Sequence, residues 1–340
     1  MRRPVGISLL LLFLLFFLPW LWGEPSQATL TEDPPPEEEP EQTEPSPPPS
    51  TVVGTDRSTT LRVLVSGQLR QMDLEAYLLG VVRAEMPASF ELEALKAQAV
   101  AARTYTLYKE LSGGSANHPE ADACDDITCC QAYKTYEEAA LDWGAEAEAY
   151  EAKIRQAVEE TDGQYVLYEG APVLAVFHSS SVGTTQDAAA VWSGSLPYLQ
   201  SVETPEGEET VPGYRSTASF TAAELKALLQ DALPEADLNR DPSNWFTNIR
   251  QQSSGTVTAL AVGGVEISGH QLRTALGLRS ACFTISFDAD TITFSVSGYG
   301  HGVGLSQYGA NVLAAGGMDY QEILSWYYTG TEVGPYQPPA

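Results

Sequence analysis

The sequence predicts an α+β fold, because helix-like and strand-like segments occur in separate runs without regular strand–helix–strand alternation. Apolar residues recur at helical spacing between residues 73 and 110, and the pattern changes to period two between residues 164 and 177. We therefore expect one folded region at residues 61–335. A transmembrane helix at residues 1–23 and a disordered linker at residues 24–60 are expected to precede it.

The N-terminal segment has the features of a signal anchor. Arg2 and Arg3 precede an apolar run at Val5–Trp22. As a helix, these roughly 18 residues reach ~27 Å, which is just long enough to span a bilayer. The two arginines place the remainder of the chain outside the membrane. A cleavable signal peptide is the alternative, although no Ala-x-Ala-like cleavage site follows the run.

The linker is rich in proline and glutamate, and its centre is the run Glu32–Pro40. Such a segment cannot bury a hydrophobic core, so we expect it to be extended and self-repelling. Its functional interpretation is a spacer between the membrane and the folded region. The alternative is a tail with no task of its own.

Local signals place the elements of the folded region in order. The predicted helices begin at Asp73, near Phe90 (to about Glu110), at Glu146 (to Glu160), at the capping box Thr221–Glu224, after Ser306 and after Asp319. The predicted strands are Leu61–Val65, a hairpin joining Gln164–Tyr168 to Val173–Phe177, Asn248–Gln251, Thr256–Val262 and Thr291–Val296. An irregular, cysteine-bearing loop is predicted at residues 117–133.

The chain is strongly acidic, with a formal net charge of −27 over 340 residues. This balance argues against nucleic-acid binding, since the composition lacks a basic footprint. An acidic protein that acts on an acidic polymer needs local cations, which draws attention to Lys96 and Arg103. Solvated charges on a helix surface are the alternative for this pair.

Glu85 is the leading candidate for a reactive acid. It lies in the segment Val81–Pro87, where the proline fixes the backbone of a helix-ending corner. Lys96 and Arg103 lie on nearly one face of the next helix, so we expect this acid to face two cations. A lone glutamate works as a general acid when burial raises its pKa, and as a base once its proton has left. A solvated surface glutamate is the alternative.

The cysteine-bearing loop contains four potential metal ligands, which are His118, Cys124, Cys129 and Cys130. One imidazole and three thiolates suit tetrahedral zinc. A disulfide is the first alternative, and free thiols are the second. Cys282 is distant in sequence and is expected in the core.

A polar turn after Phe177 is a candidate for sugar binding, because Ser180, Ser181 and Thr184 supply hydroxyl groups there. A serine nucleophile beside His178 is the sharper alternative. We do not expect it, since neighbouring residues at a strand end point in opposite directions and no Gly-x-Ser-x-Gly elbow occurs.

The glycine-rich segment at residues 298–309 predicts tight backbone turns around His301. Ser306 can cap the following helix, and Gln307 comes directly after it. His301 is interpreted either as a residue of a ligand groove or as a buried structural histidine. The spacing fits neither a dinucleotide-binding fingerprint nor a P-loop.

Several of these segments together resemble the stage II sporulation protein D family. They occur in the family's order and are Tyr77–Pro87, Glu93–Tyr105, Gly269–Arg273, Leu276–Ser280, Gly300–Ala310 and Ile323–Gly330. The resemblance covers about Leu61 to Val333 and extends to a secreted amidase-enhancer branch.

The resemblance implies a peptidoglycan lytic transglycosylase with a grooved catalytic region. Such an enzyme cuts the β-1,4 bond between MurNAc and GlcNAc in peptide-stripped glycan strands and leaves 1,6-anhydroMurNAc ends. The family's catalytic glutamate falls on Glu85, and its helix cations fall on Lys96 and Arg103, which would meet the free lactyl carboxylate. The expected substrate-binding residues are Lys96, Arg103, Ser180, Ser181, Thr184, His301, Ser306 and Gln307.

The resemblance also implies a metal site, partners and a location. The family pattern His-x5-Cys-x4-His-Cys matches His118, Cys124 and Cys130, while Cys129 replaces the second histidine. A Cys3His set remains suitable for structural zinc. The implied setting is engulfment during sporulation, with a single-pass anchor in the cell membrane and the catalytic domain outside. The implied partners are a peptide-stripping wall amidase and other engulfment membrane proteins.

Two other functions remain open at this point. One is a glycan-binding activator of a wall amidase without catalysis of its own. The other is a zinc-dependent wall hydrolase.

Overall fold

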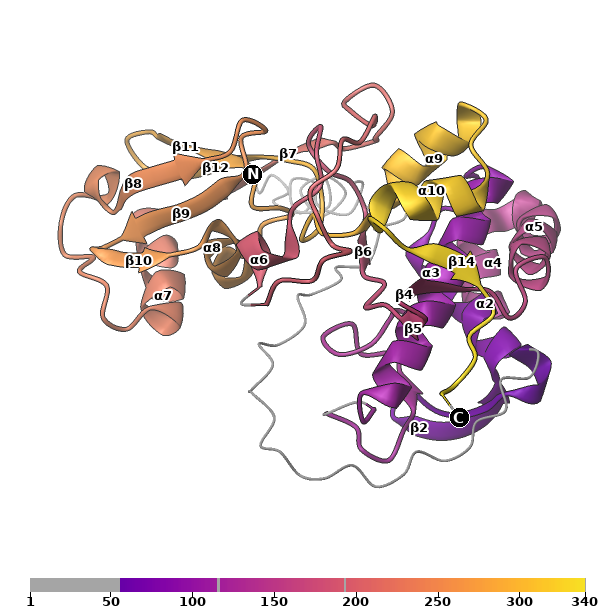
Figure 1. The fold of residues 1–340 in the computed structure, drawn as a ribbon. Coiled ribbons are helices and arrows are strands. Elements are labelled where there is room, and N and C mark those ends of the chain that lie inside the picture. The colour runs from indigo at the N-terminus through magenta and orange to yellow at the C-terminus, as the bar shows by residue number, and fades with distance from the viewer. Residues whose placement is uncertain (1–55, 115–116, 193, 340) are drawn as a thin grey trace, which may run out of the picture.

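The computed structural model describes residues 56–114, 117–192 and 194–339. The two largest hydrophobic clusters are separate and divide these residues into two lobes. The first lobe contains residues 56–207 and 298–339, and the second lobe contains residues 215–297 between them. Figure 1 shows the two lobes side by side, with the second lobe in orange. The predicted mixed α+β class is confirmed, but the predicted single region contains two cores.

Helix α3 is the centre of the first lobe. It packs against α2, α5, α9 and α10, which surround it in Figure 1. Its fully buried alanines let these neighbours approach closely. The helices of this lobe are α2 (Leu74–Glu85), α3 (Leu92–Leu111), α4 (Tyr136–Trp143), α5 (Ala147–Glu159), α6 (Ala188–Val191), α9 (Gln307–Ala315) and α10 (Tyr320–Tyr327), with the short 3-10 helices η2 (Asp56–Ser58) and η3 (Gly144–Glu146).

The strands of the first lobe form small sheets around these helices. β1 (Thr60–Val65) pairs antiparallel with β2 (Gln68–Asp73) and parallel with β3 (Ala123–Cys124). β4 (Tyr165–Tyr168) lies between β5 (Ala171–Pro172) and β14 (Glu332–Gly334). β6 (Phe177–His178) pairs with β13 (Leu305–Ser306), which brings the two predicted sugar-binding segments side by side.

The second lobe is built from two three-stranded antiparallel sheets and two helices. One sheet has the order β11–β12–β7 and the other β10–β9–β8. Their bounds are β7 (Arg215–Phe220), β8 (Phe246–Gln251), β9 (Val257–Val262), β10 (Val265–Ile267), β11 (Phe283–Phe287) and β12 (Ile292–Ser297). The helices are α7 (Ala222–Ala232) and α8 (Gly269–Leu276), with η4 (Pro242–Asn244).

Two boundaries differ from the sequence-based predictions. The segment Val173–Phe177 was expected to be the second strand of a hairpin, but β4 turns into the short β5 instead. The Val176 carbonyl accepts hydrogen bonds from the Leu305 amide and the Tyr328 hydroxyl, so the segment is buried in the first core. The folded region also begins before Leu61, because Asp56 is already buried.

Among the residues described, no helix has both the length and the apolar character that crossing a membrane requires. The predicted anchor at residues 1–23 and most of the predicted linker lie outside the described residues.

Candidate active site

Glu85 is the last residue of α2. Asp73 caps the start of the helix, because its carboxylate accepts a hydrogen bond from the Ala76 amide at 2.7 Å. It ends because Met86, which precedes a proline, takes an extended conformation with φ −126° and ψ 136°. This corner directs the Glu85 side chain into the protein, where the residue is only 3% exposed.

The environment of Glu85 favours its protonated form. Burial raises the pKa of the Glu85 carboxyl to about 8, although a hydrogen bond from the Ala132 amide, at 2.6 Å to Oε1, opposes the shift. No charged side chain is among the causes of this shift. The carboxyl is therefore a proton donor near neutral pH, as a general acid must be.

Lys96 is held by carboxylates rather than left free. Its Nζ atom lies 2.7 Å from Glu93 Oε1 and 2.6 Å from Glu160 Oε2. The ammonium group also lies 5.9 Å from the centroid of the Tyr320 ring. This lysine ties α3 to the end of α5.

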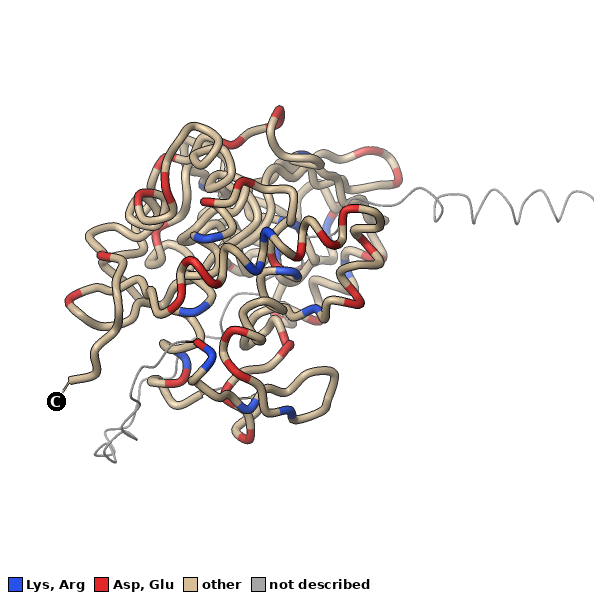
Figure 2. The backbone as a smooth tube through the Cα atoms, turned by 90° about the vertical axis from the view of Figure 1, so that its right-hand side faces the viewer, with Lys and Arg blue, Asp and Glu red and all other residues tan. Residues whose placement is uncertain are grey.

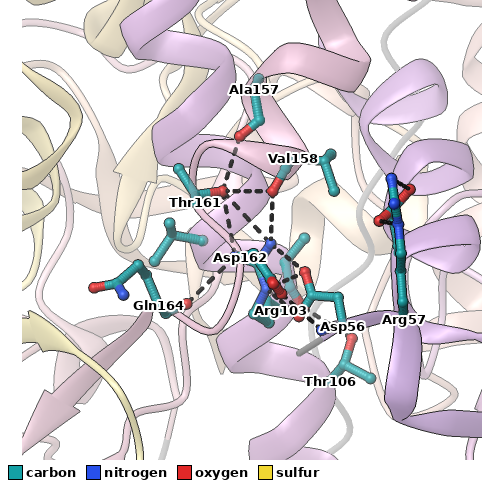
Figure 3. Close-up of polar contacts among 12 residues, drawn as sticks. Asp56, Arg57, Arg103, Thr106, Ala157, Val158, Thr161, Asp162 and Gln164 are labelled. Atoms are coloured by element: carbon teal, nitrogen blue, oxygen red, sulfur yellow. Dashed lines mark hydrogen bonds and ion pairs between the residues drawn. The ribbon is translucent and has the colours of Figure 1, made fainter. Parts of the chain in front are cut away.

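Arg103 is fully buried. It forms an ion pair with Asp56, which Figure 3 shows. Its Nη2 atom donates to Asp56 Oδ2 at 2.6 Å, and Nε donates to the same carboxylate at 2.9 Å. The remaining contacts go to the Val158 and Gln164 carbonyls and the Thr161 hydroxyl. Burial nevertheless raises the pKa of Asp56, with the arginine opposing the shift. Each nitrogen of the guanidinium therefore has an acceptor inside the protein.

The structure does not bring these two cations to Glu85, contrary to the expectation of one acid facing two cations. The charge of Glu85 acts on the pKa of Tyr105, which also lies on α3. Tyr105 follows Lys96 by about two and a half helical turns, so the two side chains leave α3 on opposite sides. Lys96 and Arg103 face α5, and Glu85 lies on the other side of α3.

The cysteine-bearing loop gathers potential metal ligands. Ligand atoms of His118, Cys124 and Cys129 all lie within 4.8 Å of one another. A hydrogen bond with the Cys130 thiol is the largest cause that raises the pKa of Cys124, so the fourth predicted ligand adjoins the group. None of the four cysteines, Cys282 included, forms a disulfide bond among the described residues. The imidazole and the two thiols at these separations, with the Cys130 thiol beside them, are a ligand set that suits a tetrahedral zinc ion.

This loop supports Glu85 directly. Gln131, next to Cys130, donates to the Ala102 carbonyl at 3.4 Å, and the Tyr105 hydroxyl donates to the Cys129 carbonyl at 3.3 Å. Both contacts hold the loop against α3. The amide that hydrogen-bonds Glu85 belongs to the next residue, Ala132. The conformation of the cysteine loop therefore sets the position of the acid.

The first polar segment contains a pair that sequence reasoning did not expect. His178 Nδ1 lies 3.1 Å from the Val303 carbonyl, and Nε2 lies 2.6 Å from Ser181 Oγ. Since a carbonyl only accepts, Nδ1 carries the proton and Nε2 accepts from the serine. Burial lowers the pKa of His178 to about 4, which makes it a weak base for a serine nucleophile. The distance between His178 and Ser181 would allow a serine nucleophile. The low pKa of His178 is the argument against a serine hydrolase.

The other predicted residues of this region differ in their surroundings. Ser180 is buried, and its hydroxyl has no hydrogen-bond partner among the described residues. Thr184 is half-buried. His301 is buried between His178 and Trp192, with ring centroids at 5.6 and 5.3 Å. Its Nδ1 accepts a hydrogen bond from the Val303 amide at 3.1 Å. These contacts favour a buried structural histidine over a residue of a ligand groove.

Glu206 joins the two polar segments, and sequence reasoning missed it. Its carboxylate accepts from the Ser181 amide at 2.7 Å, from Ser306 Oγ at 2.5 Å and from the Thr204 hydroxyl. The run of acidic residues around it reads as an exposed loop, but Glu206 is only 4% exposed. Ser306 also accepts from the Gly309 amide as the predicted helix cap.

Gln307 connects this region to the Glu85 side of α3. Its Nε2 donates to Gln98 Oε1 at 3.3 Å. Gln98 precedes Tyr105 by about two turns, so both leave α3 on the same side. The glycine-rich segment and the Glu85 corner are therefore neighbours of one helix face.

Comparison with known proteins identifies the family. A family model described as Stage II sporulation protein matches residues 66–168. Stage II sporulation protein D of Bacillus subtilis (strain 168) is 40% identical over 266 residues, which are 78% of this chain and 75% of the relative. The protein of the same name from Bacillus amyloliquefaciens is 36% identical over the same shares.

The chain therefore belongs to the stage II sporulation protein D family, which takes part in sporulation. The chain is also similar to a protein named amidase enhancer from Bacillus subtilis (strain 168). That protein is 30% identical over 308 residues, which are 76% of this chain and 40% of the relative.

Proposed function

We propose that this protein is a lytic transglycosylase that cleaves the MurNAc–GlcNAc β-1,4 bond of peptide-stripped peptidoglycan. One observation supports this proposal above the others: Glu85 is a buried carboxyl whose pKa is raised to about 8. A carboxyl that keeps its proton at neutral pH can protonate a glycosidic oxygen. The corner in which it lies belongs to the segment that resembles the family's catalytic motif.

The reaction needs a single carboxyl. Glu85 donates its proton to the leaving GlcNAc oxygen as the glycosidic bond breaks. The C6 hydroxyl of the same MurNAc attacks the anomeric carbon, and the Glu85 carboxylate takes the proton that this hydroxyl loses. The proton is thus returned, no water is consumed, and the new strand end is 1,6-anhydroMurNAc.

A second carboxylate is not required by this route, unlike the paired acids of ordinary glycosidases. Among the described residues, no other carboxylate contributes to the pKa of Glu85. Glu206 is a buried carboxylate in contact with the polar segments, but three donors already occupy its oxygens. We assign it to positioning the two segments.

In this proposal Thr184, which is half-buried, contacts the sugar. The Ser180 hydroxyl is enclosed in the protein and has no hydrogen-bond partner among the described residues. The other four predicted polar residues, Ser181, His301, Ser306 and Gln307, hold the segments in place through the internal contacts described above. Lys96 and Arg103 are assigned to fixing α3 against α5 rather than to contacting the substrate.

Zinc is proposed as a structural metal at the cysteine loop. His118, Cys124, Cys129 and Cys130 would hold it, and a site closed by four protein ligands leaves no position for substrate. When bound, the ion would fix the loop whose Ala132 amide hydrogen-bonds Glu85. The zinc-dependent hydrolase is therefore the less favoured function.

The setting is proposed from the family and the sequence together. We expect a single-pass anchor at residues 1–23, an outward-facing catalytic domain, and a wall amidase that strips peptides before cleavage. Other engulfment membrane proteins are the further expected partners. A relative named amidase enhancer favours a second candidate function, a glycan-binding activator of an amidase without catalysis.

One experiment separates these functions. Peptide-stripped glycan is incubated with the protein and with Glu85→Gln, and the products are analysed by mass spectrometry beside a known transglycosylase. The proposal predicts anhydro ends from the wild type only, with glycan binding retained by the variant. Uncut glycan with the wild type would support the activator, and equal products from both would contradict the role of Glu85.

A further inference from the structure

Most described cations of this protein are already engaged by carboxylates. Figure 2 shows the basic residues scattered among the acidic ones along the chain. Lys96 and Arg103, the cations that the resemblance points to, are both in ion pairs on the far side of α3 from Glu85. An anionic substrate at Glu85 therefore needs another positive group.

Arg279 meets this need. No carboxylate lies within ion-pair distance of it among the residues described, and it is only half-buried. Its guanidinium stacks over the Tyr299 ring at 4.3 Å, and Nη1 donates to the Gly213 carbonyl at 3.3 Å. The backbone is fixed as well, because the Arg279 carbonyl accepts from the Gly300 amide at 2.8 Å. This arginine is held in place with its charge unpaired.

Its surroundings connect Arg279 to the Glu85 corner. The Tyr308 amide at the start of α9 donates to the Ser179 carbonyl at 3.0 Å, next to the Ser180 backbone that pairs with Tyr299. The charge of Arg279 also opposes the rise in the pKa of Tyr308. The Tyr308 ring packs edge-on against Phe90, with ring centroids 4.9 Å apart. Phe90 closes the turn that follows Met86 and Pro87, since its amide donates to the Pro87 carbonyl at 3.0 Å.

Tyr299, Tyr308 and Arg279 are all half-buried, so each presents part of its side chain to solvent. The Tyr299 backbone also exchanges two hydrogen bonds with Ser180, at 2.8 and 3.0 Å. Ser180 carries the buried hydroxyl that lacks a partner among the described residues. Two partly exposed aromatic rings and a guanidinium together suit a sugar ring that carries a carboxylate.

We propose that Arg279 binds the free lactyl carboxylate of MurNAc, with Tyr299 and Tyr308 against the sugar ring. This inference rests on the proposed function and names the group that selects its substrate. A stem peptide converts the lactyl carboxylate to an amide, which removes the charge that Arg279 would meet. The arginine is thereby the residue that distinguishes stripped strands from peptide-bearing ones.

The test measures binding in the Glu85→Gln background, where nothing is cleaved. The probes are peptide-stripped glycan strands and neutral chitin oligomers of equal length, titrated by calorimetry at two salt concentrations. Adding Arg279→Gln is expected to weaken binding of stripped glycan about 10-fold, the range of a charge-assisted hydrogen bond. Binding of chitin is expected to change less than about 2-fold. Arg279→Lys should retain part of the difference, because it retains the charge.

Arg70→Gln is the matched control, since Arg70 is exposed and its side chain hydrogen-bonds Gln68, with no ion pair to a described carboxylate. It should leave both affinities unchanged. Equal losses for both probes, parent-like binding by Arg279→Gln, or no binding of stripped glycan by the parent would each overturn the proposal. Because no step requires cleavage, a wild type that binds stripped glycan through Arg279 without cutting it would refute the transglycosylase and leave this inference intact.

Discussion

Replacing Glu85 by glutamine gives the sharpest test of whether the folded protein keeps the Glu85 carboxyl protonated. Glutamine is neutral and nearly the same size, and its side-chain oxygen can still accept from the Ala132 amide. The folded protein holds the Glu85 proton up to a pKa of about 8, whereas the unfolded chain releases it near 4.5. Between these two values the folded state binds more protons, so its stability falls as pH rises.

The magnitude follows from the two pKa values. From pH 4.5 to pH 7, Glu85 should lower the free energy of unfolding by about 3 kcal/mol, and the loss should level off above pH 8. Glu85→Gln lacks this dependence. Its stability relative to the wild type should therefore increase by about 3 kcal/mol over the same interval.

Urea unfolding followed by tryptophan fluorescence measures this difference at a series of pH values. Other groups that titrate, such as His178, cancel because both proteins contain them. Glu148→Gln, at an exposed position on α5, is the control and should parallel the wild type. Parallel curves for Glu85→Gln and the wild type would show that the carboxyl is not held protonated, and would remove the main support for a general acid.

Three further perturbations test the roles assigned to other residues. Arg103→Ala should lower the free energy of unfolding by about 3–5 kcal/mol, because it leaves Asp56 buried without its partner. The rate of cleavage per folded molecule should stay within about 2-fold of the wild type. A large loss of activity at unchanged stability would instead mean that Arg103 contacts the substrate. Cys129→Ser should reduce bound zinc, measured by atomic emission, and lower the melting temperature; unchanged metal content would contradict the site. Gly80→Ala should cost about 1–3 kcal/mol in urea unfolding, since its new Cβ would meet the Tyr133 ring at 2.1 Å; wild-type stability would show that the ring moves freely.

Local signals in the sequence were enough to predict most helix starts. Asp73, Thr221, Ser306 and Asp319 all cap helices where expected, because a cap needs only a side chain and an amide two or three residues away. The strand prediction for Val173–Phe177 was wrong because a buried apolar segment has the same composition as a strand.

Contacts between distant segments explain what sequence reasoning missed at the site. Arg103 looks like a surface cation until Asp56, which lies 47 residues earlier, is placed beside it. Glu206 lies in an acidic run, and its partner Ser306 is 100 residues away. Nothing in the sequence marked Arg279 as a binding residue, apart from its place in a segment that resembles the family. Helical spacing put Lys96 and Arg103 on one face of α3, but only the packing shows that this face meets α5.

The origin of the oxygen atoms in the product tests the central claim most directly. Stripped glycan is cleaved in water enriched in heavy oxygen, and the new MurNAc ends are analysed by mass spectrometry. Attack by the C6 hydroxyl predicts ends that are one water lighter than a hydrolysis product and carry no label. Labelled reducing MurNAc ends would mean that water is the nucleophile, and would contradict a single-carboxyl transglycosylase built around Glu85.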